Sequence, residues 1–293
     1  MARYRSEALF RTYRGRLRPL SHYTLGWLPR LTRVTARVPG LARVANAVMS
    51  VAPLRSLAFR VIGLDPRRGM PALQSGTFTA WARRRSLLAG GVPASASSDP
   101  VSGASDSISV ASGPISGASN PVSEARERGG VPASSTPASP GPTRERGGVP
   151  ASSTPASSMT ASPILSGPRD PSGRPYALVW ADSFSQTLDD AGARAVVDVL
   201  EANGFAPIVA PDACCGLTWI TTGQLTGAKK HLSSLLGVLA PFAASGIPIV
   251  GVEPSCTAVL RDDLLDLLPE DPRSLLVSGA TRTLAEVLSA VPA

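Results

Sequence analysis

The sequence predicts an α/β protein with a small three-layer, parallel-sheet unit at its C-terminus, preceded by a basic helical segment and a long disordered linker. Three observations support this. Short apolar runs alternate with helical stripes late in the chain, arginine is concentrated before residue 86, and low-complexity sequence fills the middle. They divide the 293 residues into a connector segment at 1–85, a linker at 86–174 and a cysteine-rich domain at 175–293.

The first segment is strongly basic. Residues 1–85 contain 17 Arg, no Lys and 2 acidic residues, so this segment carries +15 while the rest of the chain carries −7. Within it, four prolines divide the stretch Ser21–Pro66 into short pieces: Pro29, Pro39, Pro53 and Pro66. One predicted helix has an apolar face: Leu41, Val44, Ala45 and Val48. We expect short helices that need a partner surface to be stable.

The middle segment is repetitive. "RERGGVPASSTPAS" occurs at Arg126–Ser139 and again at Arg144–Ser157, and "GGVPAS" also occurs at Gly90–Ser95. A sequence so poor in aromatic and long aliphatic side chains buries too little surface to offset the entropy lost on ordering. It is typical of a disordered linker.

The last segment has the pattern of alternating strands and helices. "YALVW" (Tyr176–Trp180), "FAPIVA" (Phe205–Ala210) and "IPIVGV" (Ile247–Val252) are suited to buried parallel strands. One intervening helix has an apolar stripe: Ala193, Val196, Val197 and Leu200. The next has a longer one: Leu225, Ala228, Leu232, Leu235, Leu236 and Leu239. A helix after Pro254 and a strand in "SLLVSG" (Ser274–Gly279) extend the unit, which right-handed crossovers close into three layers.

The three cysteines follow predicted strands. Cys214 and Cys215 come after the second strand, and Cys256 comes after the third, in the first turn of a helix for which Ser255 is a candidate cap. Ligands bind at this edge of open α/β sheets, and a helix N-terminus favours the metal-binding thiolate. Small buried thiols are an equally good interpretation, because the spacing matches no zinc motif. A disulfide between neighbouring cysteines would be strained.

Other polar residues have structural interpretations. His231 is expected on a solvated helix face, His22 and Tyr23 at a packing corner, Asp182 in a turn cap, and Glu253 in the loop before Cys256. The sequence contains no glycine-rich phosphate loop and no Ser-His-Asp order.

Two phrases resemble a known family. "CCGLTWITTGQL" and the later "PIVGVEPSCTAVLRDDLLDLLP" resemble the CCG region of iron–sulfur oxidoreductases, in particular the FAD-linked oxidases of the D-lactate dehydrogenase and glycolate oxidase type. "MARYRSEALFRTYRGRLRPLSHYTLGWLPR" resembles the connector that follows the ferredoxin-like segment in those proteins, and "DPRRGMPALQSGTFTAWARRR" resembles the run into their CCG unit. The likeness covers the first and last segments and skips the linker.

The resemblance implies a function. Cys214, Cys215 and Cys256 would be metal ligands of an iron–sulfur cluster, and Gly216 would let the turn approach that cofactor. The cluster would pass on electrons from a flavin that oxidises a 2-hydroxy acid such as D-lactate or glycolate. The chain lacks a flavin domain, a CxxCxxCxxxCP run and a second CCG copy. The resemblance therefore implies part of a larger enzyme, with FAD and the ferredoxin-like clusters in a partner subunit or parent protein.

Two alternatives remain open. The chain could be a non-catalytic remnant or protein-interaction module without a cluster. The basic segment could contact nucleic acid or an acidic membrane, although its arginines are scattered among apolar helical positions and form no nucleic-acid motif. We therefore expect no specific nucleic-acid partner and leave a peripheral membrane contact open. We predict a cytoplasmic location, because the chain has few cysteines and no recognisable signal peptide. We also predict no transmembrane segment, because no apolar run is long enough to span a membrane.

Overall fold

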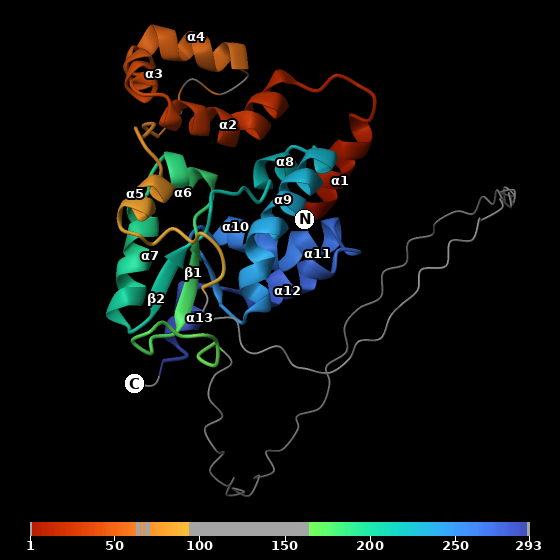
Figure 1. Cartoon of the computed structure of the whole chain (residues 1–293). Helices are drawn as coiled ribbons and strands as arrows, with labels where there is room; N and C mark the ends of the chain where they lie inside the picture. The colour runs from red at the N-terminus through yellow and green to blue at the C-terminus, as the bar shows by residue number, and fades with distance from the viewer. Residues whose placement is uncertain (1, 63–64, 66, 68–70, 94–163, 292–293) are drawn as a thin grey trace, which may run out of the picture. The chain divides into compact units, whose positions relative to one another are not determined.

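The computed structural model describes residues 2–62, 65, 67, 71–93 and 164–291 (Figure 1). Most of the predicted linker at 86–174, including both copies of its repeat, lies outside the described residues. The described parts before and after it belong to one contact-defined unit, so the basic segment and the cysteine-rich domain pack together.

A four-stranded parallel sheet forms the centre of the protein. Its strands are β1 (Tyr176–Trp180), β2 (Ala206–Val209), β3 (Ile249–Gly251) and β4 (Thr281–Arg282), in the order β2-β1-β3-β4. Leu178 of β1 is paired with both Ile208 and Ile249. The three strands predicted from the apolar runs are confirmed, and so is the α/β class.

Helices cover both faces of the sheet. Leu178 and Trp180 pack on the side of α9 (Leu225–Ala244) and α12 (Pro272–Ala280), while Ala177 and Val179 pack on the side of α7 (Ala191–Ala202). This alternation is the two-residue period of a strand that is buried on both faces. Figure 1 shows α7 on one side of β1 and α9 and α12 on the other, as three layers require.

The predicted strand at Ser274–Gly279 is wrong, because these residues lie within α12. Asp271 caps that helix by accepting a hydrogen bond from the Arg273 N–H at 3.1 Å, and Pro272 occupies the first helical turn. Both features favour a helix start over a strand. The fourth strand follows directly at Thr281–Arg282.

Short helices begin just after the strands. They are α6 (Ser183–Thr187), α8 (Leu217–Thr221), α10 (Pro254–Ala258) and α13 (Leu284–Leu288). The helix α10 continues through a π-helical turn at Val259–Asp263 into α11 (Leu264–Leu267). The helices α6, α8 and α10, which follow β1, β2 and β3, therefore border the carboxyl edge of the sheet, where the cysteines are expected.

The basic segment is helical, as predicted. Its helices are α1 (Ala2–Thr12), α2 (Leu20–Arg37), α3 (Leu41–Ser50), α4 (Ala52–Ile62) and α5 (Phe78–Arg84). Pro39 and Pro53 lie at helix boundaries, but Pro29 is buried inside α2 and does not end it. The missing N–H of a proline removes one helical hydrogen bond, and tertiary packing of α2 outweighs that loss. Pro66 lies outside the described residues.

The basic helices dock on the carboxyl edge of the sheet. The helix α2 packs against α6 and α8, α1 packs against α8 and α9, and α5 packs against α6. The helices α3 and α4 pack on each other and on α2. The predicted apolar face of α3 is not buried, because Val44 and Val48 are exposed to solvent.

Both described ends of the predicted linker contact the folded unit. The N–H of Ala89 donates to the Val209 carbonyl at 2.9 Å, and the N–H of Val209 donates to the Leu87 carbonyl at 2.8 Å. Residues 87–89 therefore extend the sheet beside β2. At the other end, the N–H of Tyr176 in β1 donates to the Pro168 carbonyl at 3.0 Å. Within the described ranges, no helix is long and apolar enough to cross a membrane.

Candidate functional site

Three loops meet at the carboxyl edge of the sheet. Asp182 and Ser183 follow β1, Cys214 and Cys215 follow β2, and Cys256 lies in α10 after β3. The strand β1 lies between β2 and β3, so the three loops are neighbours. The indole Nε1 of Trp180 donates to the Ala213 carbonyl at 3.1 Å, which anchors the cysteine loop to the end of β1.

The structure brings the three cysteines together as a thiol cluster, by which we mean Cys214, Cys215 and Cys256. The Cys215 side chain lies within hydrogen-bonding reach of both other thiols. All three cysteines are free and buried. The backbone N–H of Gly216 donates to Cys214 Sγ at 3.4 Å, and the Ser183 side chain also hydrogen-bonds Cys214.

The surroundings of the thiol cluster favour protonated thiols. The hydrogen bond with Cys215 and burial raise the pKa of Cys214 well above its usual value. Two opposing effects act on the pKa of Cys215. The hydrogen bond with Cys214 lowers this pKa, while the hydrogen bond with Cys256 and burial raise it by more, so the pKa of Cys215 lies well above its usual value. Deprotonation of the cluster at neutral pH therefore requires a bound cation or another source of positive charge.

The helix that carries Cys256 is capped by Glu253 and not, as expected, by Ser255. Glu253 Oε2 accepts the Cys256 N–H at 2.7 Å, while the Ser255 hydroxyl donates to Oε1 at 2.9 Å. The hydrogen bond with Cys215 acts to lower the pKa of Cys256, but burial and the nearby carboxylates of Asp182 and Glu253 raise it overall. The expected thiolate stabilisation at this short helix is therefore outweighed by burial together with the nearby negative charge.

Asp182 serves as a turn cap, as the sequence predicts. Its carboxylate accepts hydrogen bonds from the Phe184 N–H at 2.8 Å and the Ser185 hydroxyl at 2.5 Å. Both oxygens are engaged and the residue is buried. Asp182 therefore influences the thiol cluster through its charge and is already committed to holding α6.

Gly216 allows a close approach, but the group that approaches is a helix. Its φ is +77°, a left-handed conformation that favours glycine. A Cβ at this position would lie 3.2 Å from the His231 Cβ and 3.3 Å from the Ala228 Cα, both in α9. Packing of α9 against the cysteine loop therefore explains this glycine without a cofactor.

Arg33 connects the basic segment to the thiol cluster, and sequence analysis missed it. From α2, its Nη2 donates to Asp212 Oδ1 at 2.8 Å and to Ser183 Oγ at 3.0 Å. Ser183 in turn hydrogen-bonds Cys214. Arg33 and Asp212 are far apart in the chain, and neither belongs to a recognisable local motif. Only the charge contrast between the two segments pointed to such a contact.

An aromatic and cationic stack borders the same loop. The Arg30 guanidinium lies 5.2 Å from the ring centre of Trp27 and 5.4 Å from that of Trp219, and the His231 ring lies 5.2 Å from Trp219. The expectation of a solvated His231 is therefore wrong in part, since this residue is half-buried and packs on Trp219 of α8. Burial and the charges of Arg30 and Arg33 lower its pKa, which favours the neutral imidazole.

The expected packing corner contains His22. The His22 ring lies edge-on to Tyr13, with the ring centres 5.4 Å apart, and the His22 carbonyl accepts a hydrogen bond from Gln224. Tyr23 next to it is partly exposed. This corner joins α2 to the loop before α9.

The thiol cluster provides the right kind of ligand for an iron–sulfur centre. Thiolates are the usual ligands of such clusters, commonly four in number, and here the Cys215 thiol lies within hydrogen-bonding reach of the two others. In the structure they pack on one another, and no group of three His, Cys, Asp or Glu side chains in the described residues is arranged as a ligand set. The cysteines therefore match such a cofactor in the type of donor, while the described residues present no arranged ligand set for it.

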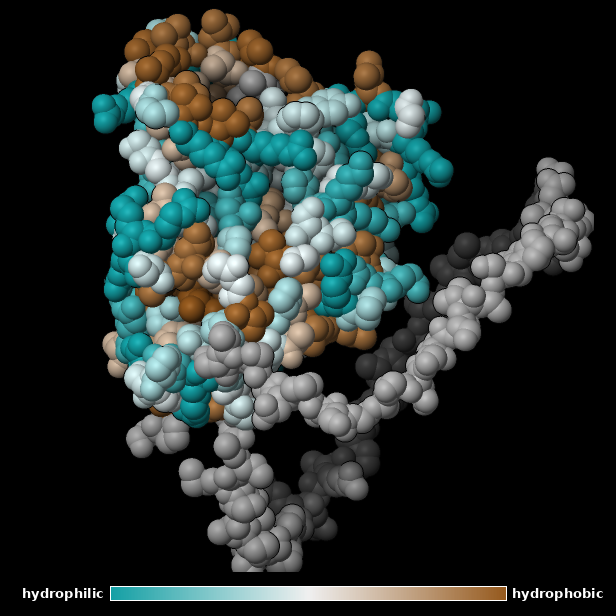
Figure 2. Space-filling view, viewed as in Figure 1, coloured by the Kyte–Doolittle hydropathy of each residue, from teal (hydrophilic) through white to brown (hydrophobic). Residues whose placement is uncertain are grey.

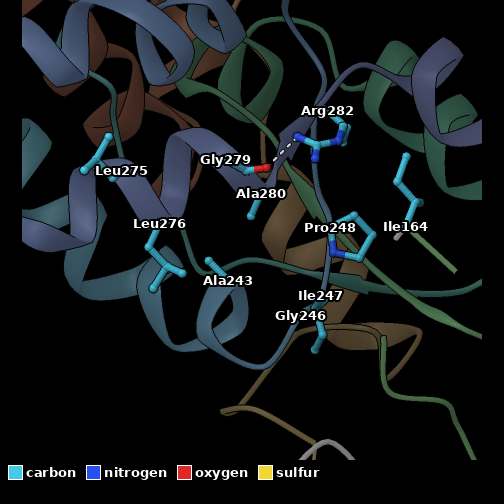
Figure 3. Close-up of a pocket in the computed structure, with 10 residues that line it drawn as sticks. All are labelled: Ile164, Ala243, Gly246, Ile247, Pro248, Leu275, Leu276, Gly279, Ala280 and Arg282. Atoms are coloured by element: carbon cyan, nitrogen blue, oxygen red, sulfur yellow. Dashed lines mark hydrogen bonds between the residues drawn. The ribbon is translucent and has the colours of Figure 1, made fainter. Parts of the chain in front are cut away.

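A separate pocket lies at the opposite end of the sheet (Figure 3). It has a volume of about 330 Å³ and is mainly apolar, with Leu275 and Leu276 of α12 on one side and Pro248 on another. Its one charged side chain, Arg282, donates to the Gly279 and Thr281 carbonyls. This pocket offers an apolar surface and lies away from the thiol cluster.

Comparisons with protein-family models, with curated proteins and with solved structures found no match for this chain.

Proposed function

We propose that this chain is the iron–sulfur electron-transfer part of an FAD-linked 2-hydroxyacid oxidoreductase. The single observation that carries the proposal is the meeting of Cys214, Cys215 and Cys256 at the carboxyl edge of the sheet. Packing of the basic helices on that edge is a second support, because the motif resemblance spans both parts of the chain.

The chain's own residues have defined roles in this proposal. The three cysteines would hold the cluster, which supplies one-electron transfer when bound. Trp180 and Gly216 fix the loop that carries two of the thiols. Arg33 places positive charge beside Ser183 and Cys214, where a cluster with thiolate ligands would be anionic.

The proposed partner is a subunit with flavin and ferredoxin-like domains. It would supply FAD and the remaining ligand, and it would deliver electrons from a 2-hydroxy acid such as D-lactate or glycolate. A reducing cytoplasm is the proposed location, and the three free thiols are compatible with it.

Anaerobic reconstitution tests the proposal. The full chain is incubated with iron and sulfide under reducing conditions, desalted, and assayed for bound iron and acid-labile sulfide. The proposal predicts retention of both, with loss in a variant that carries Cys214→Ser, Cys215→Ser and Cys256→Ser. Ser255→Ala is the matched control, because Ser255 adjoins Cys256 and hydrogen-bonds only Glu253 among the side chains of the described residues.

A second candidate is a protein-interaction module without a cluster. The raised pKa values and mutual packing of the thiols favour this alternative, since both are features of small buried side chains. Equal iron content in the wild type and the triple serine variant would support it and would reject the electron-transfer proposal.

A further inference from the structure

The helices α3 and α4 present an apolar face to solvent. We call it the α3–α4 face, and it consists of Val44, Val48, Val51, Leu54, Leu57 and Val61. The spacing of these residues is helical. Val44 and Val48 lie at i and i+4 of α3, and Leu54, Leu57 and Val61 lie at i, i+3 and i+7 of α4. Leu57 and Val61 are each 62% exposed. Figure 2 shows the apolar side chains gathered over α3 and α4.

This face is not needed for the protein's own core. The opposite sides of the two helices supply Ala42 and Phe59, which are buried. Asn46 also fixes α3 by hydrogen-bonding both the N–H and the carbonyl of Leu73, at 2.9 Å and 2.8 Å. A helix pair that is already anchored and still exposes a second apolar stripe indicates an external contact.

The charge around the face has one sign. From Ala8 to Leu64 the chain contains ten Arg and no acidic residue. Arg43 precedes Val44, and Arg60 lies three residues after Leu57, so both flank the apolar stripe. Both are exposed, and neither forms an ion pair within the described residues. The complementary surface is therefore apolar and negatively charged.

We propose that the α3–α4 face docks on the surface of an anionic lipid bilayer. Aliphatic side chains would enter the interface between headgroups and acyl chains, while Arg43 and Arg60 would extend to lipid phosphates. The face consists of Val and Leu, which are uncommon in protein-interface hot spots, and it contains neither of the aromatic residues, Trp and Tyr, that are enriched there together with Arg. Nucleic acid would use the arginines but would leave the exposed valines and leucines without a partner.

The proposal is independent of the thiol cluster, because the α3–α4 face contains none of its cysteines and α3 and α4 pack on each other and on α2. A protein held in this way would lie on the membrane without spanning it. If the electron-transfer proposal also holds, docking would bring the chain near a membrane-soluble electron acceptor.

Vesicle co-sedimentation of the full chain tests the proposal. The probes are phosphatidylcholine vesicles with and without about 30% phosphatidylserine, an anionic lipid that gives the vesicle surface a negative potential. We expect binding to the anionic vesicles that weakens as salt is raised. The double variant Leu57→Ser/Val61→Ser should lower the partition coefficient at least about tenfold. Arg43→Gln/Arg60→Gln should lower it roughly fivefold per arginine.

Matched variants separate docking from general effects. Leu275→Ser removes a leucine that is 71% exposed on α12, and Arg83→Gln/Arg84→Gln removes two exposed arginines of α5. Both should leave vesicle binding unchanged. Circular dichroism should show wild-type helix content in every variant, because the changed side chains are exposed.

Three results would overturn the proposal. The first is absence of binding to anionic vesicles by the well-folded wild type. The second is equal vesicle binding by the wild type and Leu57→Ser/Val61→Ser, since the arginines alone would then account for binding, as they would with nucleic acid. The third is a dimer in light scattering that this double variant converts to monomer while vesicle binding stays the same, since the face would then join two copies.

Discussion

Replacement of Arg33 by methionine tests whether the basic segment is held on the thiol edge by charge. The Arg33 and Asp212 side chains are only 16% and 11% exposed, with Nη2 and Oδ1 2.8 Å apart. Removal of one partner from a fully buried pair costs about 3–5 kcal/mol. Both groups keep some solvent contact here, and Arg37 remains 3.3 Å from the other Asp212 oxygen. We therefore expect a loss of about 2 kcal/mol in the free energy of unfolding.

Urea denaturation measures this loss, and a double-mutant cycle assigns it to the pair. Asp212→Asn combined with Arg33→Met should cost less than the sum of the single changes, with a coupling of about 1–2 kcal/mol. Arg85→Gln is the control, because its ion pairs with Asp198 and Glu201 are exposed and should contribute at most about 1 kcal/mol. Equal losses for Arg33→Met and Arg85→Gln, or no coupling to Asp212, would refute the reasoning.

Three further predictions follow from the core, the cysteine loop and the thiols. Leu232→Ala should destabilise the protein by about 2–5 kcal/mol in urea, because Leu232 is fully buried in α9. Gly216→Ala should lower Tm by more than Gly204→Ala. Both glycines have a left-handed φ, but of the two only Gly216 has neighbouring atoms within 4 Å of an added Cβ. Equal changes in Tm would contradict this prediction. The pKa values of Cys214 and Cys215 are higher in the folded protein than in the unfolded chain, so loss of the thiol protons favours unfolding. Stability in the metal-free protein should therefore decline as pH rises above about 9, the ordinary thiol value, and the triple serine variant should show a smaller decline.

The sheet was predictable because its strands are local apolar runs. Tyr176–Trp180 matches β1, and the alternating burial of its residues follows from the two-residue period of a strand. The apolar stripe of α9 was equally clear, and all six of its predicted residues are buried. In such elements the local pattern and the tertiary environment agree.

The errors arose where local patterns had more than one outcome. The run Leu275–Val277 suits a strand or a helix, and the Asp271–Pro272 start decided for the helix. The apolar pattern of Val44 and Val48 does not mark the side of α3 that is buried within the protein, because Ala42 on another side makes the buried contact. Arg33 had no local signal, because its partners are distant in the chain. The meeting of the cysteines was predictable, since topology alone places strand ends at one edge.

Electron paramagnetic resonance of the reconstituted and reduced full chain tests the central claim most directly. Cys215 is the residue to change, because its thiol lies within hydrogen-bonding reach of the two other thiols of the thiol cluster. The account predicts a cluster signal in the wild type and in Ser255→Ala, and loss or alteration of that signal in Cys215→Ser. No signal in the folded wild type, or an identical signal in Cys215→Ser, would contradict the claim that these thiols hold an iron–sulfur cluster.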